Sequence, residues 1–284
     1  MKPQTVETMP GKPRVSFPDT GVLTVIPLEG LRIHSYQAPE TAVFVSSHIL
    51  ETPNRLIVID TQFLRPHAEQ FRRYIDSLNK LIDRVIITHS HPDHWFGSEF
   101  FRDVPRFALQ GVADEIAAGG EAMIQSYAPA FGNAITETVV APQGVVRPGS
   151  ETIDGIRLSY EEADGAEAGV NLVIELPAHR VLIAQDIVYN RVHPFLRQKD
   201  VDPWLSIIRR YREGAYDLVL AGHGLPTNMQ ALAEMERYLT GARSALAASS
   251  DIAMLKERLV GGNPGYQGEL MLDISARDLY GAEG

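Results

Sequence analysis

Residues 88–94 read Thr-His-Ser-His-Pro-Asp-His and close an apolar run, residues 84–88, that is typical of a buried strand. Four side chains that can bind a metal ion fall within six residues of this segment: His89, His91, Asp93 and His94. Because a tight loop follows the strand, the first two side chains can point to one side while the last two point towards a neighbouring position. This spacing predicts two metal ions roughly 3.5–4 Å apart. The alternative is a solvated turn that is rich in histidine.

The spacing of apolar residues divides the rest of the chain into two halves that each run from strands to helices. In the first half we expect strands at 22–27, 31–36, 41–47, 55–60, 84–88 and 106–109, and helices at 65–81, 94–101 and 112–127. In the second half we expect strands at 156–161, 170–176, 180–184 and 216–221, a helix at 202–213 with Asp202 as its N-cap, and one long helix or two at 227–259. Two halves of this kind predict an α/β fold, an αβ/βα sandwich.

The ends and the cysteine content limit the domain organisation and the kind of metal site. Residues 1–20 are polar and rich in proline, so we expect an N-terminal arm there, and we take residues 21–284 as a single domain. The chain has no cysteine, which excludes disulfides, thiol nucleophiles and thiolate ligands. Any metal ion must therefore be held by nitrogen and oxygen atoms.

The charge balance limits the partners. The chain has 26 basic and 36 acidic residues and a formal net charge of −10. Because binding to phosphate relies on clustered Lys and Arg, this balance argues against nucleic acid and against an anionic membrane surface. No stretch approaches the ~20 apolar residues of a membrane span, and the first residues have no secretory signal. We therefore expect a cytoplasmic protein with a small-molecule substrate, and we leave a homodimer open.

The segment 88–94, followed by Trp-Phe-Gly-Ser at 95–98, resembles the signature of the metallo-β-lactamase superfamily of dinuclear metallohydrolases. The resemblance extends over about residues 22–240 and implies a four-layered αβ/βα sandwich. Asp186, which follows an apolar run, resembles the aspartate that bridges both metals of that superfamily. His223, within Gly-His-Gly at 222–224, resembles its last histidine ligand.

One landmark of the superfamily is replaced in this chain. The family usually has a Gly-His-Thr-Pro-Gly segment whose histidine binds the first metal, but this chain has no histidine between the first motif and His179. The matching position is Glu167, in Gly-Ala-Glu-Ala-Gly at 165–169, and a similar Gly-Thr-Glu-Ala pattern occurs in the alkylsulfatase branch. Asp164 and Glu162 are alternatives by distance, and a site without a protein ligand at this position is another.

The resemblance implies two divalent metals, held by His89, His91 and Glu167 on one side and by Asp93, His94 and His223 on the other, with Asp186 between them. We expect zinc, with manganese or iron as alternatives because carboxylates suit those ions too. A hydroxide shared by the two metals would attack the substrate. In addition to binding metal, Asp93 is expected to handle the proton of the leaving group.

Tyr189 lies three residues after Asp186 and resembles a tyrosine of the lactonase branch that donates to the substrate carbonyl. The alternative is an aromatic side chain that serves packing only. Arg191 and His193 lie on the same loop and could touch the substrate. Residues 119–133, with Met123, Tyr127 and Phe131, form either an apolar lid or a buried helix.

These residues together predict a metal-dependent hydrolase that cleaves a small ester-like bond. Glu167 favours a sulfate ester, whereas Tyr189 favours a lactone or carboxylic ester. One alternative is an iron-dependent redox member of the same fold that oxidises sulfur compounds. Another is a metal-binding scaffold without catalytic activity.

Overall fold

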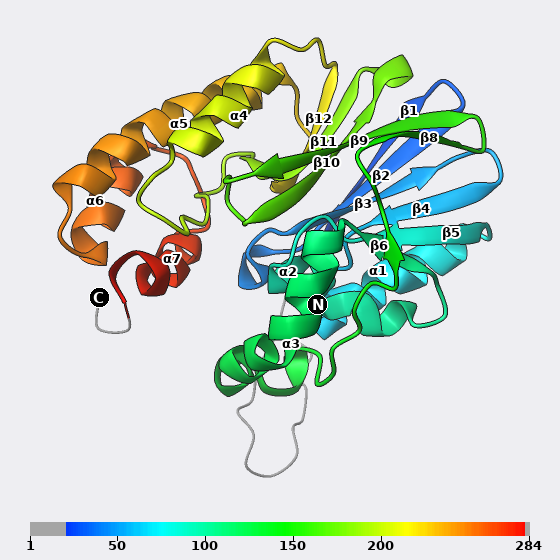
Figure 1. Cartoon of the computed structure of the whole chain (residues 1–284), viewed down its shortest axis with the longest axis horizontal. Helices are drawn as coiled ribbons and strands as arrows, with labels where there is room; N and C mark the ends of the chain where they lie inside the picture. The colour runs from blue at the N-terminus through cyan, green and yellow to red at the C-terminus, as the bar shows by residue number, and fades with distance from the viewer. Residues whose placement is uncertain (1–20, 282–284) are drawn as a thin grey trace.

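The computed structural model describes residues 21–281, whose strands form two sheets that pack face to face (Figure 1). Within this range the larger sheet has seven strands in the order β1-β2-β3-β4-β5-β6-β7. They are β1 (Val22–Leu28), β2 (Leu31–Gln37), β3 (Ser46–Glu51), β4 (Arg55–Ile59), β5 (Leu81–Ile86), β6 (Arg106–Ala108) and β7 (Gly144–Val145). The smaller sheet of the same range has the order β12-β11-β10-β9-β8. Its strands are β8 (Gly149–Ile153), β9 (Ile156–Asp164), β10 (Val170–Leu176), β11 (Val181–Tyr189) and β12 (Leu218–His223).

Helices cover the outer faces of both sheets (Figure 1). The α-helices are α1 (Arg65–Ser77), α2 (Pro92–Trp95), α3 (Gln110–Phe131), α4 (Asp202–Arg212), α5 (Met229–Ala248), α6 (Ile252–Gly262) and α7 (Leu270–Tyr280). Short 3₁₀ turns lie at Glu40–Ala42, Phe96–Phe101, Gly132–Ala134 and Pro177–His179. Helices α4 and α5 contact β11 of the smaller sheet, and Phe71 of α1 packs against Tyr36 of the larger one. The order helix, sheet, sheet, helix confirms the predicted α/β sandwich.

Strand ends from both sheets meet at one edge of the sandwich. Strands β4 and β5 pair in parallel in the larger sheet, and β11 and β12 pair in parallel in the smaller one. The carbonyl of Thr88 accepts a hydrogen bond from the Leu172 amide of β10 at 2.8 Å, and Val45 forms an isolated bridge with His223. These bonds join the two sheets beside the strand ends, so the loops that carry the predicted ligands come together.

The strand predicted at 41–47 is wrong. This region has a 3₁₀ turn and then two left-handed residues, Val43 (φ 54°) and Phe44 (φ 57°), before β3 begins at Ser46. The apolar run at 43–45 looks like a strand because its side chains are mostly buried, yet the backbone turns there instead of pairing. The turn places the Val43 carbonyl beside the end of β12.

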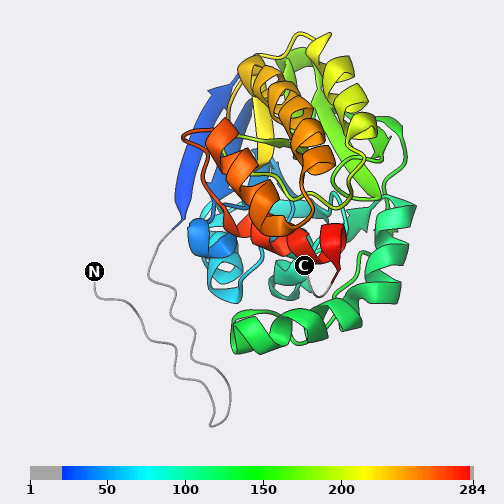
Figure 2. The ribbon, with the colours of Figure 1, turned by 90° about the vertical axis from the view of Figure 1, so that its left-hand side faces the viewer.

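The helices of the second half differ from the prediction in two places, the N-cap of α4 and the additional helix α7, whereas two helices over 227–259 were one of the predicted alternatives. Helix α4 begins at Asp202 itself, with Val201 as its N-cap, so the predicted capping role of Asp202 is wrong. The carboxylate of Asp202 instead pairs with Arg243 of α5 at 2.8 Å. The region 227–259 forms two helices, α5 and α6. The final helix, α7, lies at the same end of the molecule as α3 (Figure 2) and has no counterpart among the predicted elements.

Among the helices of residues 21–281, none has the length and apolar character needed to cross a membrane. The N-terminal arm predicted for residues 1–20 lies outside the described residues. Treatment of residues 21–284 as a single domain stays a prediction.

Candidate metal centre

The predicted metal ligands lie in one cluster at the edge where the strand ends meet. Asp93 and His94 lie on the short helix α2, which begins at Pro92, a position where a missing backbone N–H costs nothing. Three overlapping groups have ligand atoms within 4.8 Å of one another: His89, His91 and Glu167; His89, His94 and Asp186; and Asp93, His94 and His223. All seven predicted side chains are therefore brought together.

Glu167 lies in the loop between β9 and β10 and forms one side of the cluster. Its side chain is only 1% exposed. Its Oε1 lies 2.5 Å from Nδ1 of His91, and its Oε2 lies 3.5 Å from Nε2 of His89. The two alternatives, Glu162 and Asp164, lie on β9 with exposed side chains. The geometry therefore places Glu167, and neither alternative, beside the two histidines.

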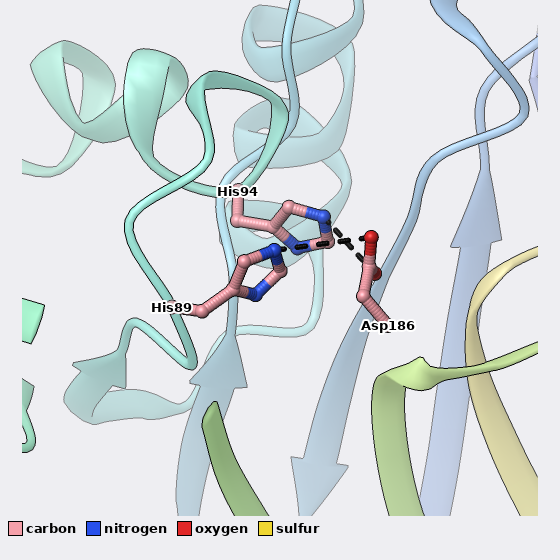
Figure 3. Close-up of side chains that lie close together, drawn as sticks. All are labelled: His89, His94 and Asp186. Atoms are coloured by element: carbon pink, nitrogen blue, oxygen red, sulfur yellow. Dashed lines mark ion pairs between the residues drawn. The ribbon is translucent and has the colours of Figure 1, made fainter. Parts of the chain in front are cut away.

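Asp186 lies at the centre of the cluster. Its Oδ1 is 3.2 Å from Nε2 of His94, and its Oδ2 is 3.0 Å from Nε2 of His223. His89 lies next to His94 and faces the same carboxylate, with Nε2 3.8 Å from Oδ2 of Asp186 (Figure 3). Asp93 completes this side, with its Oδ2 3.3 Å from Nε2 of His223. One carboxylate thus faces histidines of both groups.

Buried polar atoms at the centre of the cluster test whether the site fits a metal ion. Four of them have no hydrogen-bond partner among residues 21–281: Nε2 of His89, Nε2 of His94, Oε2 of Glu167 and Oδ1 of Asp186. Buried polar atoms are rarely left unpaired, because their desolvation then goes uncompensated. Imidazole nitrogens and carboxylate oxygens are also common ligands of zinc. A divalent cation would pair these atoms, so the residues fit one.

Electrostatics within the cluster point to a missing positive charge. Burial alone would lower the pKa of His94 and of His223, but the Asp186 carboxylate raises the pKa of His94 well above its usual value and that of His223 to about 10. Against the effect of burial, His94 and His223 lower the pKa of Asp93 to about 2. Protons on the histidines therefore balance the carboxylates in the metal-free protein, and a bound cation would replace them.

Asp60 orients His94 from behind and is a site residue that the sequence analysis missed. Its Oδ2 accepts hydrogen bonds from Nδ1 of His94 and from Oγ1 of Thr88, each at 2.8 Å. Its Oδ1 accepts from the Thr88 amide at 2.8 Å. Carboxylates that hold the second nitrogen of a ligating histidine fix its tautomer and orientation. An acidic residue directly after the apolar strand β4 was the available signal.

The backbone carbonyl of Val43 orients His223 in the same way. It accepts a hydrogen bond from Nδ1 of His223 at 2.6 Å, which leaves Nε2 to face Asp186. Val43 and Phe44 both adopt left-handed backbone conformations, which are costly for a β-branched residue such as Val43. No side-chain pattern in the sequence signals such a contact, because the acceptor belongs to the backbone.

A buried polar chain continues behind Asp60. Gln185 donates through Nε2 to Oδ2 of Asp60, and its Oε1 accepts from Nε2 of His48 at 2.9 Å. Burial lowers the pKa of His48 to about 4, so this imidazole is neutral at pH 7. His48 therefore acts as a neutral donor that holds the Gln185 side chain.

The substrate-donor role expected of Tyr189 does not match its position. The ring is buried, stacks on His223 with centroids 4.6 Å apart, and does not line the cavity described below. Its hydroxyl donates to Oδ2 of Asp186 at 2.7 Å. The pairing of β11 with β12 is irregular between Gln185 and Tyr189, so side chains do not alternate regularly there, and the phenol lies on the same side as Asp186. Tyr189 supports a predicted ligand and offers no free donor to a substrate.

Arg191 and His193 also lie away from the site, so the expectation that they touch substrate is wrong. Arg191 pairs with Glu234 of α5 at 2.8 Å. His193 is fully buried, and its Nδ1 lies 2.8 Å from the hydroxyl of Tyr238. Both side chains attach the loop after β11 to α5.

A cavity of about 390 Å³ opens onto the cluster, and its floor includes His91, Asp93, Glu167 and Asp186. Helices α3 and α7, which lie near each other in Figure 2, supply much of its wall. The lining side chains from these helices and their neighbours are mostly apolar: Val43, Phe63, Ala122, Met123, Tyr127, Phe195, Met271 and Ile274. Helix α3 therefore forms the wall expected of an apolar lid, together with α7, which the sequence analysis missed. The site combines an acidic floor with an apolar chamber.

Solved structures of metallo-beta-lactamases have a similar fold. A metallo-beta-lactamase from Pontibacter korlensis superimposes with a TM-score of 0.59 at 19% identity, covering 77% of this chain and 99% of that one. The DIM-1 metallo-beta-lactamase gives a TM-score of 0.56 at 18% identity, covering 78% of this chain and 98% of that one. At this level of identity the likeness concerns the fold alone.

Two curated relatives are sulfatases by name. The chain is 26% identical over 225 residues to an alkyl/aryl-sulfatase of Saccharomyces cerevisiae, covering 64% of this chain and 35% of the relative. It is 24% identical over 247 residues to a linear primary-alkylsulfatase of Pseudomonas sp., covering 72% of this chain and 45% of the relative. The chain thus spans less than half the length of either relative.

The sequence profile of the metallo-beta-lactamase superfamily matches residues 41–223. This range holds all seven clustered side chains and more than half of the chain. The profile, the sandwich and the buried cluster agree. The chain belongs to the metallo-beta-lactamase superfamily.

Proposed function

We propose that this protein is a hydrolase that uses two divalent metal ions to cleave sulfate esters that carry an apolar alkyl or aryl group. The observation that carries the proposal is Glu167, which lies buried beside His89 and His91 where the superfamily usually has a histidine. The same position links the sequence to the alkylsulfatase branch. The names of both curated relatives, a yeast alkyl/aryl-sulfatase and a Pseudomonas alkylsulfatase, support it.

The ligand charges allow an anionic substrate once metal is bound. Asp93, Glu167 and Asp186 would contribute three negative charges, against four positive charges from two divalent ions. The ions and these three ligands would then sum to one positive charge before the attacking hydroxide is counted, and to zero with it, so the site would carry no net negative charge to repel a sulfate monoester. Nitrogen and carboxylate ligands are compatible with zinc, manganese and iron, and we propose zinc as the first choice.

The chemistry would be divided between the metals and the side chains of the cavity floor. Bound divalent ions would supply a water molecule of lowered pKa and a Lewis acid for the sulfuryl oxygens. Asp93 lines the cavity, so its carboxylate can take up a proton from the attacking water and return it to the leaving alcohol. Tyr189 would hold the Asp186 carboxylate in place through its hydrogen bond.

The apolar chamber supports an apolar group on the ester. Its walls include Phe63, Met123, Phe195, Met271 and Ile274. Burying such a group contributes roughly 0.8 kcal/mol for each CH₂ removed from water. A lactone or carboxylic ester is less well supported, because the phenol of Tyr189, which favoured it, is bonded to Asp186.

The proposal is tested by measuring products from a panel of esters with zinc- or manganese-loaded protein. The panel contains decyl sulfate, an aryl sulfate, a lactone, a phosphodiester, a thioester and a β-lactam. We expect release of inorganic sulfate from the sulfate esters, and loss of that activity in Asp186→Ala. Cleavage of another class without sulfate release would contradict the proposed substrate.

A further inference from the structure

We infer that Tyr127 of α3 binds the substrate by donating its phenolic hydrogen to a sulfuryl oxygen. This inference rests on the proposed function and names the residue that recognises the sulfuryl group from the apolar side of the cavity. Tyr127 lines the same cavity as His91, Asp93 and Glu167. It is therefore a phenol that can reach a substrate lying over the predicted ligands, which Tyr189 is not.

The ring of Tyr127 is fixed by three phenylalanines. Phe63 and Phe96 meet it edge to face, with centroids 5.6 and 6.1 Å away and interplanar angles of 84°. Phe131, one turn along α3, lies 6.0 Å away at 33°. Aromatic contacts of this kind hold a ring in one orientation. The packing needs the ring only, so a phenylalanine at this position would satisfy it equally well.

The hydroxyl of Tyr127 is not used within the described part of the chain. Among residues 21–281, no hydrogen bond or ion pair involves this oxygen. The buried phenol of Tyr160 and the half-buried phenol of Tyr216 instead donate to Glu151 and Glu175 at 2.8 and 2.9 Å. A half-buried tyrosine that lines a cavity, and whose hydroxyl has no partner among the described residues, can offer that hydroxyl to a ligand.

The charges around Tyr127 keep its hydroxyl a donor. Burial is the largest influence, and together with the carboxylates of Asp93 and Asp278 it raises the pKa of Tyr127 to about 12, against a smaller effect of Arg277. The phenol therefore keeps its proton at neutral pH. The influence of Asp93 also indicates that the ring lies near the acidic floor. An oxygen-rich anionic group held over that floor would supply the acceptor that the protein lacks.

The test compares Tyr127→Phe with the wild-type protein, both loaded with zinc. The variant keeps the ring and removes only the hydroxyl. Because a hydrogen bond to a charged group is lost, kcat/KM for decyl sulfate should fall about 10- to 100-fold. The Kd for decane-1-sulfonate, whose C–S bond is not hydrolysed, should rise by a similar factor. Metal content, Tm and the Kd for decan-1-ol, which lacks the anionic group, should stay at wild-type values.

Tyr216→Phe is the matched control, because it also removes a phenolic hydroxyl, one that donates to Glu175 rather than into the cavity. It should leave kcat/KM and the sulfonate Kd unchanged. If the wild-type protein cleaves decyl sulfate and Tyr127→Phe matches it in kcat/KM and in sulfonate binding, the inference is wrong while the proposed function stands. A wild-type protein that releases no sulfate from any sulfate ester overturns both.

Discussion

Glu167 replaces an expected imidazole with a carboxylate, and this single difference changes both the charge and the selectivity of the site. Its pKa is raised by burial to about 7, although His91 acts in the opposite direction. A carboxylate with so little exposure needs a cation nearby, and His91 at 2.5 Å supplies one in the metal-free protein. A bound metal would do so in the loaded one.

Glu167→Gln tests this role, since it keeps the shape and removes the charge. We expect the affinity for zinc, measured by competition with a chelator, to fall by about 10- to 100-fold or more. Asp164→Asn is the control, because Asp164 is exposed on β9 and should change little. The opposite ranking of the two variants would move the ligand assignment to Asp164.

His48 gives a prediction about pH at the same scale. Burial lowers its pKa from 6.5 to about 4, so the folded protein resists a proton that the unfolded chain accepts. The neutral His48 therefore contributes to the free energy of unfolding in full above pH 6.5. As the pH falls towards 4 this contribution is lost, and the loss is roughly 3 kcal/mol at most. In metal-free protein, the free energy of unfolding of His48→Gln should depend less on pH over this interval than that of the wild type. Equal pH slopes from urea denaturation would show that His48 does not titrate in this way.

A site residue could be predicted from the sequence when the residues that it acts with lie close to it in the chain. His89, His91, Asp93 and His94 stand together in the chain, so their spacing alone indicates a metal site. Asp60 and the Val43 carbonyl act on ligands that are distant in sequence or through the backbone, and no local pattern reports such contacts. Tyr189 had the expected offset from Asp186, but the direction of its side chain could be known only from the fold.

At the scale of elements, α3 and α7 decide what the cavity can hold. Ile274 of α7 is half-buried and lines the chamber. Ile274→Trp would fill part of the space available to an alkyl chain. We expect kcat/KM to fall more for dodecyl sulfate than for butyl sulfate, because the longer alkyl chain would clash with the added indole ring. The measurement is the ratio of the two kcat/KM values.

Ile274→Leu is the control for this prediction, since it conserves volume and should keep the wild-type ratio. A ratio that Ile274→Trp leaves unchanged would mean that the alkyl chain does not extend along α7. The zinc content of each variant shows whether the metal centre is intact.

Elements with strong periodicity were predictable, and those set by tertiary contacts were not. Strands β4, β10 and β12 are apolar runs that need only a sheet around them, and they lie close to the predicted ranges. The segment at 41–47 is also rich in apolar residues, but it forms a turn there. In that turn the Val43 carbonyl accepts a hydrogen bond from His223 at the end of β12. In helix α7 the charged residues Asp273, Arg277 and Asp278 lie between the buried ones, and two of them, Arg277 and Asp278, line the cavity. The apolar periodicity of this helix is therefore weak in the sequence.

At the scale of the whole molecule, the site depends on two sheets that each contribute strand ends. β5 carries the histidine motif in the larger sheet, while β11 and β12 carry Asp186 and His223 in the smaller one. The metal centre therefore forms only when the sandwich is assembled, and ligand binding should stabilise the whole fold. The four-layer arrangement was predictable because the order of strands and helices repeats. Of the two helices that close the cavity, α3 was predicted and α7 was not.

The stoichiometry of bound metal tests the central claim most directly. Metal-free protein is saturated with zinc, freed of excess ion, and analysed by inductively coupled plasma mass spectrometry against protein concentration. The account predicts about two zinc ions per chain, because the cluster offers ligands for two sites that share Asp186. One ion per chain, or none, would contradict it.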